Sequence, residues 1–420
     1  MNKVKLGDLL SIKHGFAFKS ENYVNKSQYA LVTLANISST NNFQYNAEKT
    51  TFYGAEFPKD FILQTGDLIM PLTEQVVGLF GNSAFVPSIG DITFVLNQRV
   101  GKVEVNEEKA DKYYLHYLLS TNNVREQLEC RASGTRQRNI SPVDVYDVEA
   151  YVPDIESQRA IGKALYSIEK KVNLNNRIND NLQQQMALLY DYWFTQFDFP
   201  NKNGKPYKTS GGIMVWNEQL KSEIPANFQA IHISELLTLQ SGYPFSSNSY
   251  SINGKYKLIT IKNVQDSGIN LDVDNYIAEL PSNMPQYCKL KQQDILMSLT
   301  GNVGRIGLMY TDNCLLNQRV AVVHERDLEL HPYIYFMLKS NLIRKKFETI
   351  ASGSSQANLS PIEAINTFIP YNKELSIKFA VQAQGTIALI VSNLRENQYL
   401  TTLRDWLLPM LMNGQATVSD

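Results

Sequence analysis

The chain has 420 residues, which predicts two or three domains, each long enough to bury a core of its own. It carries 40 Lys or Arg and 41 Asp or Glu, so a formal net charge of −1 excludes a protein that coats nucleic acid by bulk charge, although a local basic surface remains possible. The three cysteines, Cys130, Cys288 and Cys314, lack metal or redox spacing, and their odd number favours a reducing compartment over a disulfide framework.

Residues 1–153 are predicted to form a first α+β head. Short β-type runs, among them Tyr29–Ile37 and Gly66–Thr73, are separated by Gly, Asn and Pro. One helical patch is expected within residues 112–129. This mixture of several short strands with a helix is typical of an α+β domain.

Residues 154–197 are predicted to form a long spacer helix. The segment is poor in Gly, and its mostly apolar seam recurs at alternating spacings of four and three, the heptad pattern of a coiled coil. The seam positions are Ile161, Leu165, Ile168, Val172, Asn175, Asn179, Leu182, Met186, Leu189 and Trp193. Residues 198–225 follow and are rich in Gly, Pro, Lys and Asn, so we expect a surface linker there.

The second half of the chain follows the same plan. A second α+β head is predicted over residues 226–372, a second spacer helix over 373–413 and a tail over 414–420. The seam positions of the second helix are Phe379, Ala383, Thr386, Ile390, Asn393, Asn397, Leu400, Arg404, Leu407 and Leu411. Two long helices with matching seams are expected to pack on each other.

The two halves also share sequence. The repeated segments are "LNQRV" at Leu96–Val100 and Leu316–Val320, the pair Ala132–Pro142 and Ala351–Pro361, and the pair Leu6–Tyr23 and Ile233–Tyr250. Their order is kept and only the loop lengths between them change. The chain is therefore interpreted as a duplication of about 200 residues, far longer than the unit of a solenoid.

Both seams carry two Asn residues near their middle. If a pseudo-twofold axis relates the halves, the helices run antiparallel, and Asn175 meets Asn397 while Asn179 meets Asn393. A buried Asn pair sacrifices stability to fix the register of a coiled coil. The alternative is that these side chains face solvent on slightly rotated helices.

The layout resembles the specificity, or DNA-recognition, subunit of type I restriction-modification systems. The resemblance rests on the order of head, long helix, the "PNKNGKPYKTSGG" linker that starts at Pro200, second head and second long helix, which ends in "LRDWLLPMLMNGQ" from Leu403. It covers essentially the whole chain. It implies two repeated α/β target recognition domains joined by two long antiparallel coiled-coil helices with pseudo-twofold symmetry.

The resemblance also implies a function and partners. Each head would read one half of an asymmetric bipartite sequence in double-stranded DNA, as part of host defence. The helices would set the spacing and dock two modification subunits, which carry the S-adenosylmethionine-dependent adenine methyltransferase. Restriction subunits, which use ATP and Mg²⁺, can join them. The chain itself would bind none of these cofactors.

The sequence contains no recognisable catalytic motif. An adenine methyltransferase needs an Asn/Asp-Pro-Pro-aromatic loop and a glycine-rich cofactor turn, and neither is present. There is no phosphate-binding loop of the Walker type, and Gly301, Gly304 and Gly307 are predicted to form a hairpin turn rather than a nucleotide site. The five His residues share no ligand spacing, so no metal site is expected. We therefore expect a non-catalytic chain.

The chain is also expected to be a soluble cytoplasmic protein. No apolar run approaches the roughly 20 residues of a membrane span. The start, "MNKVKLGDLL", lacks the apolar stretch of a signal peptide.

The candidate DNA contacts lie in the repeated and basic segments. The Gln-Arg pairs in "LNQRV" suit base contact, because Arg can grip guanine and Gln adenine; the alternative is a buried strand whose polar side chains bond backbone groups. The basic clusters suit phosphate contact or form solvated faces. In the other repeated segment, the amides of Gln137, Asn139, Gln356 and Asn358 suit backbone hydrogen bonds. The candidates are Gln98, Arg99, Arg125, Arg131, Arg136, Arg138, Asn139, Thr300, Asn302, Arg305, Gln318, Arg319, Arg344, Lys345 and Lys346.

A function of another class stays open at this point. Two α+β heads on a helical stalk would also suit a bivalent scaffold or a carbohydrate-binding protein. Its platforms would be the aromatic residues Phe16, Phe18, Tyr243 and Phe245. These residues sit in repeated, partly apolar segments, which favours a place in the cores.

Overall fold

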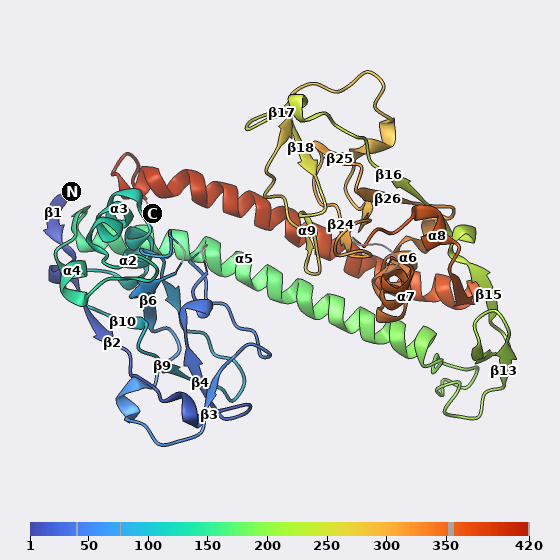
Figure 1. Cartoon of the computed structure of the whole chain (residues 1–420), viewed down its shortest axis with the longest axis horizontal. Coiled ribbons are helices and arrows are strands. Elements are labelled where there is room, and N and C mark those ends of the chain that lie inside the picture. The colour runs from blue at the N-terminus through green and yellow to red at the C-terminus, as the bar shows by residue number, and fades with distance from the viewer. Residues whose placement is uncertain (39–40, 76, 352–356, 419–420) are drawn as a thin grey trace. The chain divides into compact units, whose positions relative to one another are not determined.

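The computed structural model describes residues 1–38, 41–75, 77–351 and 357–418. The chain divides into two compact units (Figure 1). Unit 1 contains Met1–Lys171 and the residues from Leu400 onward, and unit 2 contains Val172–Tyr399. Two long helices, α5 (Ile155–Tyr190) and α9 (Lys373–Met412), therefore each contribute one part to unit 1 and the other part to unit 2.

The head of unit 1 is built on two four-stranded sheets. Their strand orders are β2-β10-β6-β8 and β3-β5-β4-β9, and β1 pairs with β12 and β7 with β11. The strands are β1 (Asn2–Lys5), β2 (Leu10–His14), β3 (Tyr23–Val24), β4 (Tyr29–Val32), β5 (Phe52–Tyr53), β6 (Leu68–Pro71), β7 (Thr73–Glu74), β8 (Ala84–Phe85), β9 (Thr93–Leu96), β10 (Val100–Val105), β11 (Arg138–Asn139) and β12 (Glu149–Val152). The helices are α1 (Leu6–Leu9), α2 (Lys112–Leu119), α3 (Asn122–Arg131) and α4 (Pro142–Tyr146).

The head of unit 2 repeats this plan. Its two main sheets have the orders β16-β26-β23-β24 and β17-β21-β18-β25-β22, and β15 pairs with β27. The strands are β15 (Gln229–His232), β16 (Leu237–Ser241), β17 (Tyr250–Ser251), β18 (Tyr256–Ile259), β19 (Val264–Gln265), β20 (Gly268–Ile269), β21 (Tyr276–Ile277), β22 (Lys289–Leu290), β23 (Ile295–Ser298), β24 (Ile306–Leu308), β25 (Cys314–Leu316), β26 (Val320–Glu325) and β27 (Phe368–Tyr371). The helices are α6 (His331–Lys339), α7 (Asn341–Ala351) and α8 (Pro361–Ile365).

Strand pairing confirms the repeat within an α+β fold. Each second sheet contains a parallel pair among antiparallel ones, β4 with β9 in unit 1 and β18 with β25 in unit 2. A parallel pair needs a long crossover between its strands, so its recurrence reflects a shared topology rather than a shared turn. The predicted hairpin turn at Gly301 and Gly304 joins β23 to β24, and both glycines have a φ of +72°.

The single helical patch predicted over residues 112–129 is wrong in detail, because two helices, α2 and α3, occupy it. The break has a local cause. The Ser120 hydroxyl donates to the Tyr117 carbonyl and the Thr121 hydroxyl to the Leu118 carbonyl, both at 2.8 Å. These side chains satisfy the carbonyl groups at the end of α2, so the backbone can turn at Thr121 before α3 begins.

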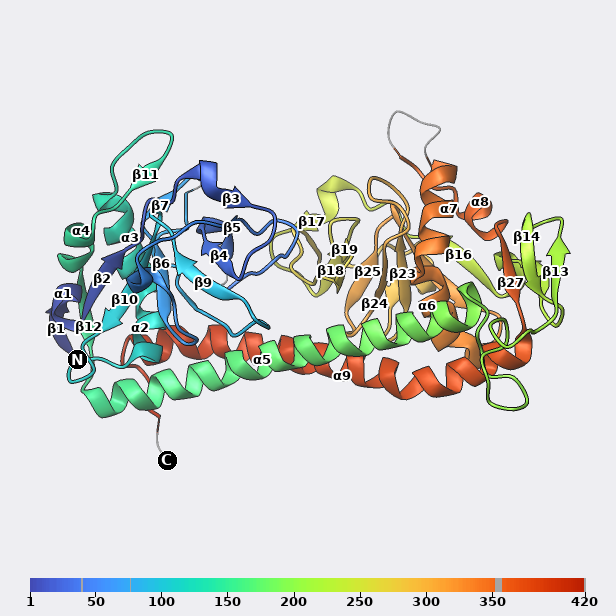
Figure 2. The same cartoon turned by 90° about the horizontal axis from the view of Figure 1, so that it is seen from below.

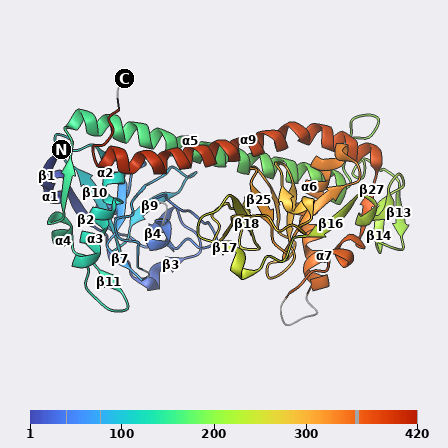
Figure 3. The same cartoon turned by 90° about the horizontal axis from the view of Figure 1, so that it is seen from above.

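The spacer helices pack through the predicted seams. No seam position on α5 or α9 is exposed. In unit 1, α5 and α9 lie side by side (Figure 2), and Ile161 and Leu165 of α5 share a core with Leu411 and Met412 of α9 and with α2. In unit 2, α6 lies against the helix pair (Figure 3). The Tyr335 hydroxyl of α6 donates to Gln183 of α5 at 3.3 Å. Each head thus packs on the helix pair through its own helix.

α9 is apolar because of this seam. By length and composition alone, α9 could cross a membrane, and it is the one helix in the described residues that passes this test. An 18-residue window within it has a mean hydropathy of 1.3. In the structure 44% of that window is buried. A helix that buries an apolar stripe against a partner helix reaches such hydropathy without any membrane.

The segment predicted as a surface linker is more structured than expected. A hairpin of β13 (Met214–Asn217) and β14 (Ser222–Pro225) occupies its second half. Phe199 and Ile224 are buried in the core of unit 2, beside a short π-helical turn, Asp191–Thr195, at the end of α5. The Gly- and Pro-rich composition predicted the turns of this segment correctly. It did not indicate that Phe199 and Ile224 would anchor the segment in the core.

Candidate nucleic-acid interface

In unit 1 the two repeated motifs meet at one edge of the head. Leu72, between β6 and β7, donates its backbone N–H to the carbonyl of Arg99 at 3.0 Å. Its carbonyl accepts from the N–H of Ile140, also at 3.0 Å. The Thr73 hydroxyl then donates to the side chain of Asn139 at 2.9 Å. The "LNQRV" turn and the segment Ala132–Pro142 are therefore joined through the strand between them.

Unit 2 builds the same junction. The N–H of Leu299 donates to the carbonyl of Arg319 at 3.0 Å, and the N–H of Leu359 donates to the carbonyl of Leu299 at 2.8 Å. Gly301 adds a bond from its N–H to Ala357 at 3.0 Å. We call this arrangement the three-segment edge. It explains why both motifs are duplicated together, since each supplies the backbone groups that the other needs.

A repeated glycine closes the back of each "LNQRV" turn. The N–H of Gly15 donates to Val100 at 3.1 Å, and that of Gly242 donates to Val320 at 3.0 Å. A Cβ atom would lie 2.0 Å from the Asn97 carbonyl oxygen at Gly15, and 2.3 Å from that of Leu316 at Gly242. Only glycine fits there, so the turn is held from behind and its two central side chains face outward.

The exposed Gln-Arg pairs occupy equivalent places in the two heads. Gln98 and Arg99 are exposed, as are Gln318 and Arg319, and in the described parts of the chain their side chains have no hydrogen-bond or ion-pair partner. The alternative of a buried strand is therefore wrong for these four residues. Their donors and acceptors remain available to a ligand.

The basic residues of head 1 are not equivalent. Arg138 pairs with Glu74 at 2.9 Å, and Glu74 is only 1% exposed. The same guanidinium group lies over the Phe80 ring, with 5.8 Å to the ring centre. Arg138 therefore neutralises a buried carboxylate, whereas Arg136 is exposed on the same loop. The ion pair gives Arg138 a framework role, and its candidate phosphate contact stays a prediction.

Two further arginines of head 1 also bond the protein itself. Arg125 donates to the side chain of Asn82 at 2.7 Å. Arg131 donates to the carbonyls of Gln127 and Asp147, both at 3.2 Å. These contacts fix α3 to its surroundings. Both guanidinium groups thus use part of their donors on the protein, and their candidate phosphate contacts stay predictions.

In head 2 one carboxylate organises two of the candidates. Asp266 pairs with Arg305 at 3.0 Å and with Arg344 at 2.8 Å. Lys346 donates to the carbonyl of Phe368 at 2.7 Å, and burial lowers the pKa of its ammonium group. Lys345 on the same helix is exposed. Of the basic residues predicted on α7, Lys346 therefore bonds the protein framework, whereas Lys345 is exposed at the surface.

The remaining candidates surround the three-segment edge of unit 2. Thr300 forms a bridge with Asn358, but its buried hydroxyl oxygen has no partner in the described structure. Asn302 is exposed at the hairpin turn, and its carbonyl accepts from Ser298 Oγ at 2.5 Å. Gln356 lies outside the described residues. Among the described candidates, Arg99 and Arg136 in head 1 and Arg319 and Lys345 in head 2 are exposed without a side-chain partner, and Arg99 and Arg319 belong to the two edges themselves.

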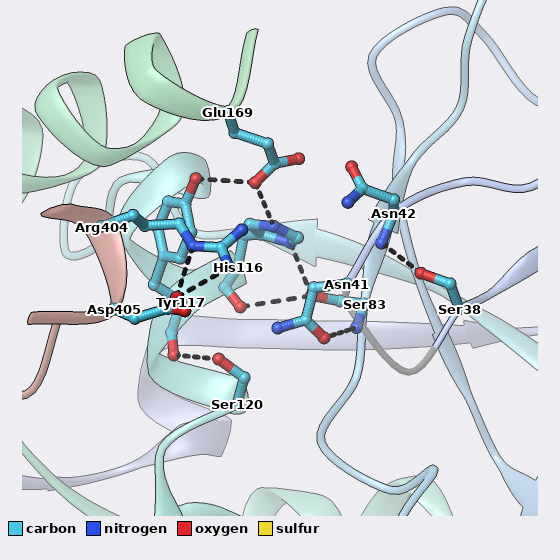
Figure 4. Close-up of polar contacts among 10 residues, drawn as sticks. All are labelled: Ser38, Asn41, Asn42, Ser83, His116, Tyr117, Ser120, Glu169, Arg404 and Asp405. Atoms are coloured by element: carbon cyan, nitrogen blue, oxygen red, sulfur yellow. Dashed lines mark hydrogen bonds and ion pairs between the residues drawn. The ribbon is translucent and has the colours of Figure 1, made fainter. Parts of the chain in front are cut away.

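Sequence reasoning missed a polar network that attaches head 1 to α5 (Figure 4). Ser83 Oγ lies 2.8 Å from His116 Nδ1, and His116 Nε2 lies 3.4 Å from Glu169 Oε2. The Tyr117 hydroxyl donates to the same oxygen at 2.8 Å. Ser83 and His116 are fully buried, so this Ser–His–Glu arrangement admits no substrate. The sequence gives one hint of this network: Glu169, a carboxylate on the spacer helix, directly follows the seam position Ile168.

The predicted Asn contacts are present in unit 2. The amide of Asn175 donates to Asn397 at 2.9 Å, and that of Asn393 donates to Asn179 at 2.8 Å. Asn179 also donates to the backbone carbonyl of Ile390 at 3.3 Å. All four side chains are buried, which is against the solvent-facing alternative. Because one residue number rises along α5 as the other falls along α9, the helices are antiparallel here.

The aromatic residues of the rival function belong to the framework. Phe16 and Phe18 pack edge to face with 5.0 Å between ring centres, and Tyr243 and Phe245 do the same at 5.0 Å. Phe18 and Phe245 are buried in small aromatic cores. A flat platform for a sugar ring needs an exposed face, so this geometry argues against carbohydrate binding.

Comparisons with known proteins agree with this duplicated architecture. The family model described as "Type I restriction modification DNA specificity domain" matches residues 1–184 and 225–404. The chain is 23% identical over 311 residues to the type I restriction enzyme MjaIX specificity subunit of Methanocaldococcus jannaschii, covering 73% of this chain and 69% of that protein. It is 22% identical to the HindI specificity subunit of Haemophilus influenzae, covering 80% and 84%.

A solved structure shares the fold. The crystal structure of the type I restriction-modification S subunit from M. genitalium matches with a TM-score of 0.59 and 18% identity, over 98% of this chain and 95% of that one. Both copies of the duplicated unit fall within the regions that the family model matches. The chain therefore belongs to the type I restriction-modification DNA specificity family.

Proposed function

We propose that each head of this specificity subunit reads one half of an asymmetric, bipartite DNA target. The observation that carries this proposal is the exposed Gln-Arg pair, held by the same glycine and the same three-segment edge in both heads. Arg and Gln have the donors and acceptors that base edges recognise in the major groove. A shared framework with different surrounding side chains suits two similar readers of different sequences.

The spacer helices are proposed to dock two modification subunits and to set the gap between the half-sites. Support comes from their outward faces, where Leu174, Leu188, Val381, Tyr399 and Trp406 are large apolar side chains at least 49% exposed. Exposed apolar side chains in such number are typical of protein interfaces. In this proposal the partners bind S-adenosylmethionine, restriction subunits add ATP and Mg²⁺, and the complex works in the cytoplasm. The chain supplies recognition and no catalysis.

Exchange of one head tests the reading model. Residues 1–153 are replaced by the head of another specificity subunit, and methylated sites are mapped across a genome. We expect one half of the target to change and the other half to persist, because α5 and α9 are left intact. The matched control replaces residues 226–372 and should change the opposite half. Alteration of both halves by either exchange would reject modular reading.

A further inference from the structure

A groove in unit 2 lies between the head and α9. It has a volume of about 660 Å³ and is lined by the end of β26, the turn before α6, the segment 292–294 and one face of α9. Its lining residues are Gln292, Gln293, Asp294, Val323, Glu325, Leu328, Glu329, His331, Pro332, Ile377, Val381, Gln384 and Ile387. This volume suits a few side chains of a docked segment.

The groove is acidic and apolar together. Asp294, Glu325 and Glu329 contribute carboxylates, and among the described residues that line the groove none is Lys or Arg. His331 Nδ1 lies 2.6 Å from Glu325 Oε1, and it is the one basic group in the lining. Leu328 and Val381 are 78% and 68% exposed. Such a surface favours a cationic side chain that has an apolar neighbour or stem.

The equivalent place in unit 1 carries mixed charge, because Asp67, Glu108 and Asp111 stand where unit 2 has Asp294, Leu328 and His331, yet cations replace three residues of the unit 2 groove. Lys109 and Glu329 stand at the same distance after the shared "LNQRV" motif. Lys112, which begins α2, stands where Pro332 follows His331 at the start of α6. Lys163 follows the seam position Ile161 as Val381 follows Phe379. The rim of the duplicated surface has thus diverged, with Lys109 and Lys163 in unit 1 where unit 2 has the carboxylate of Glu329 and the apolar side chain of Val381.

The unit 1 surface is also filled by its own side chains. Tyr113 and Tyr166 stack with 4.3 Å between ring centres, and Phe85 packs on Tyr166 at 5.2 Å. The Lys112 ammonium group lies over the Tyr113 ring, with 5.1 Å to its centre. A cationic segment that fits the unit 2 groove would meet these aromatic rings and the ammonium group of Lys112 here.

We propose that the unit 2 groove binds a cationic, apolar-bearing segment of one modification subunit, and that the second modification subunit docks without this contact. The inference rests on the proposed function. Two copies of one partner are then held unequally, because the duplicated surfaces that they meet have diverged. Loading is stepwise, and the step that uses the groove is the more sensitive to salt, since it depends on charge pairing.

Charge reversal at the rim tests this proposal. The variant Glu329→Lys changes an exposed side chain and leaves the Glu325–His331 pair in place. The matched control is Lys109→Glu at the equivalent position of unit 1. The full chain is mixed with its own modification subunit, and native mass spectrometry counts bound copies as the salt concentration rises. We expect E329K to weaken one of the two binding steps about 10-fold and K109E to change both steps less than twofold.

A second variant and a folding check distinguish failure of the groove proposal from failure of the proposed function. The variant Leu328→Ser removes the exposed apolar contact without changing charge, and should weaken the same step as E329K. Circular dichroism establishes that each variant is folded. If both steps are unchanged in E329K and L328S, or if K109E weakens binding as much as E329K, the groove proposal is overturned. If the wild-type chain binds no modification subunit, the proposed function fails instead.

Discussion

Neighbouring arginines on one loop have different roles in this molecule. Arg136 and Arg138 are separated by one residue, yet Arg138 neutralises the buried carboxylate of Glu74 and Arg136 is exposed. The sequence predicted a basic cluster but could not divide it, because Glu74 is far away in the chain and reaches Arg138 only through the pairing of β7 with β11. In head 2, the exposed carboxylate of Asp266 pairs with Arg305 and Arg344, which are also far from it in the sequence.

Substitution of these two arginines should have distinct effects. Arg136→Ala is expected to weaken DNA binding to all sequences and to lower the slope of log K against log salt by about one, as the loss of one phosphate contact does. Arg138→Ala leaves the buried carboxylate of Glu74 without its cation, so we expect a loss of about 3–5 kcal/mol in the free energy of unfolding. Salt titrations of DNA binding and urea denaturation measure the two effects.

A double variant provides the control for the second effect. Glu74→Gln combined with Arg138→Ala removes the unpaired charge and should recover part of the lost stability. An R138A protein as stable as the wild type, but with a reduced salt slope, would return Arg138 to the phosphate-contact group.

At the scale of elements, periodicity predicted the helices better than composition predicted the linker. The heptad seam depends on local spacing, so α5, α9 and their Asn contacts could be inferred from the sequence alone. The break between α2 and α3 depends on two hydroxyl-to-carbonyl bonds, and the hairpin β13–β14 depends on burial of Ile224 against a distant core. Neither contact leaves a periodic signal.

The inner Asn pair is predicted to be energetically coupled. Asn179→Leu alone leaves the amide of Asn393 buried without its acceptor, at a cost of about 1–3 kcal/mol in unfolding free energy. Asn179→Leu with Asn393→Leu should cost less than the single change, because both partners become apolar. Thermal and urea unfolding of the double-mutant cycle measure the coupling. The exposed Asn181→Ala serves as control, and purely additive losses would contradict the pairing.

At the scale of the whole molecule, the duplication was the most informative feature of the sequence. Matching segments in unchanged order predicted two heads of one topology, and the parallel strand pair in each confirms it. The sequence could not show that each unit takes parts of both long helices, because that division depends on which residues pack together in space. It also could not supply the bases that each head reads.

The spacing between half-sites should follow helix length. One heptad added to both α5 and α9, placed symmetrically about the Asn pairs, lengthens the helix pair by about 10 Å, or roughly three base pairs of DNA. It also rotates one half-site by about a third of a turn. We expect a target spacer longer by about three base pairs, or loss of specific methylation, as measured by methylome sequencing.

Two comparisons make the spacing result decisive. A heptad inserted in α5 alone leaves the seam unmatched and should impair folding. A folded double-insertion protein that still methylates the original spacing would show that the helices do not set the gap.

The division of the long helices has a consequence for synthesis on the ribosome. Unit 1 includes residues from Leu400 onward, and Leu411 and Met412 are buried in its core beside Leu165. These residues are translated only after all of unit 2. The first head therefore emerges early but stays incomplete until α9 returns to it. A nascent chain must keep this apolar surface from aggregating in the meantime, and a premature stop codon in α9 would damage the half of the protein that was made first.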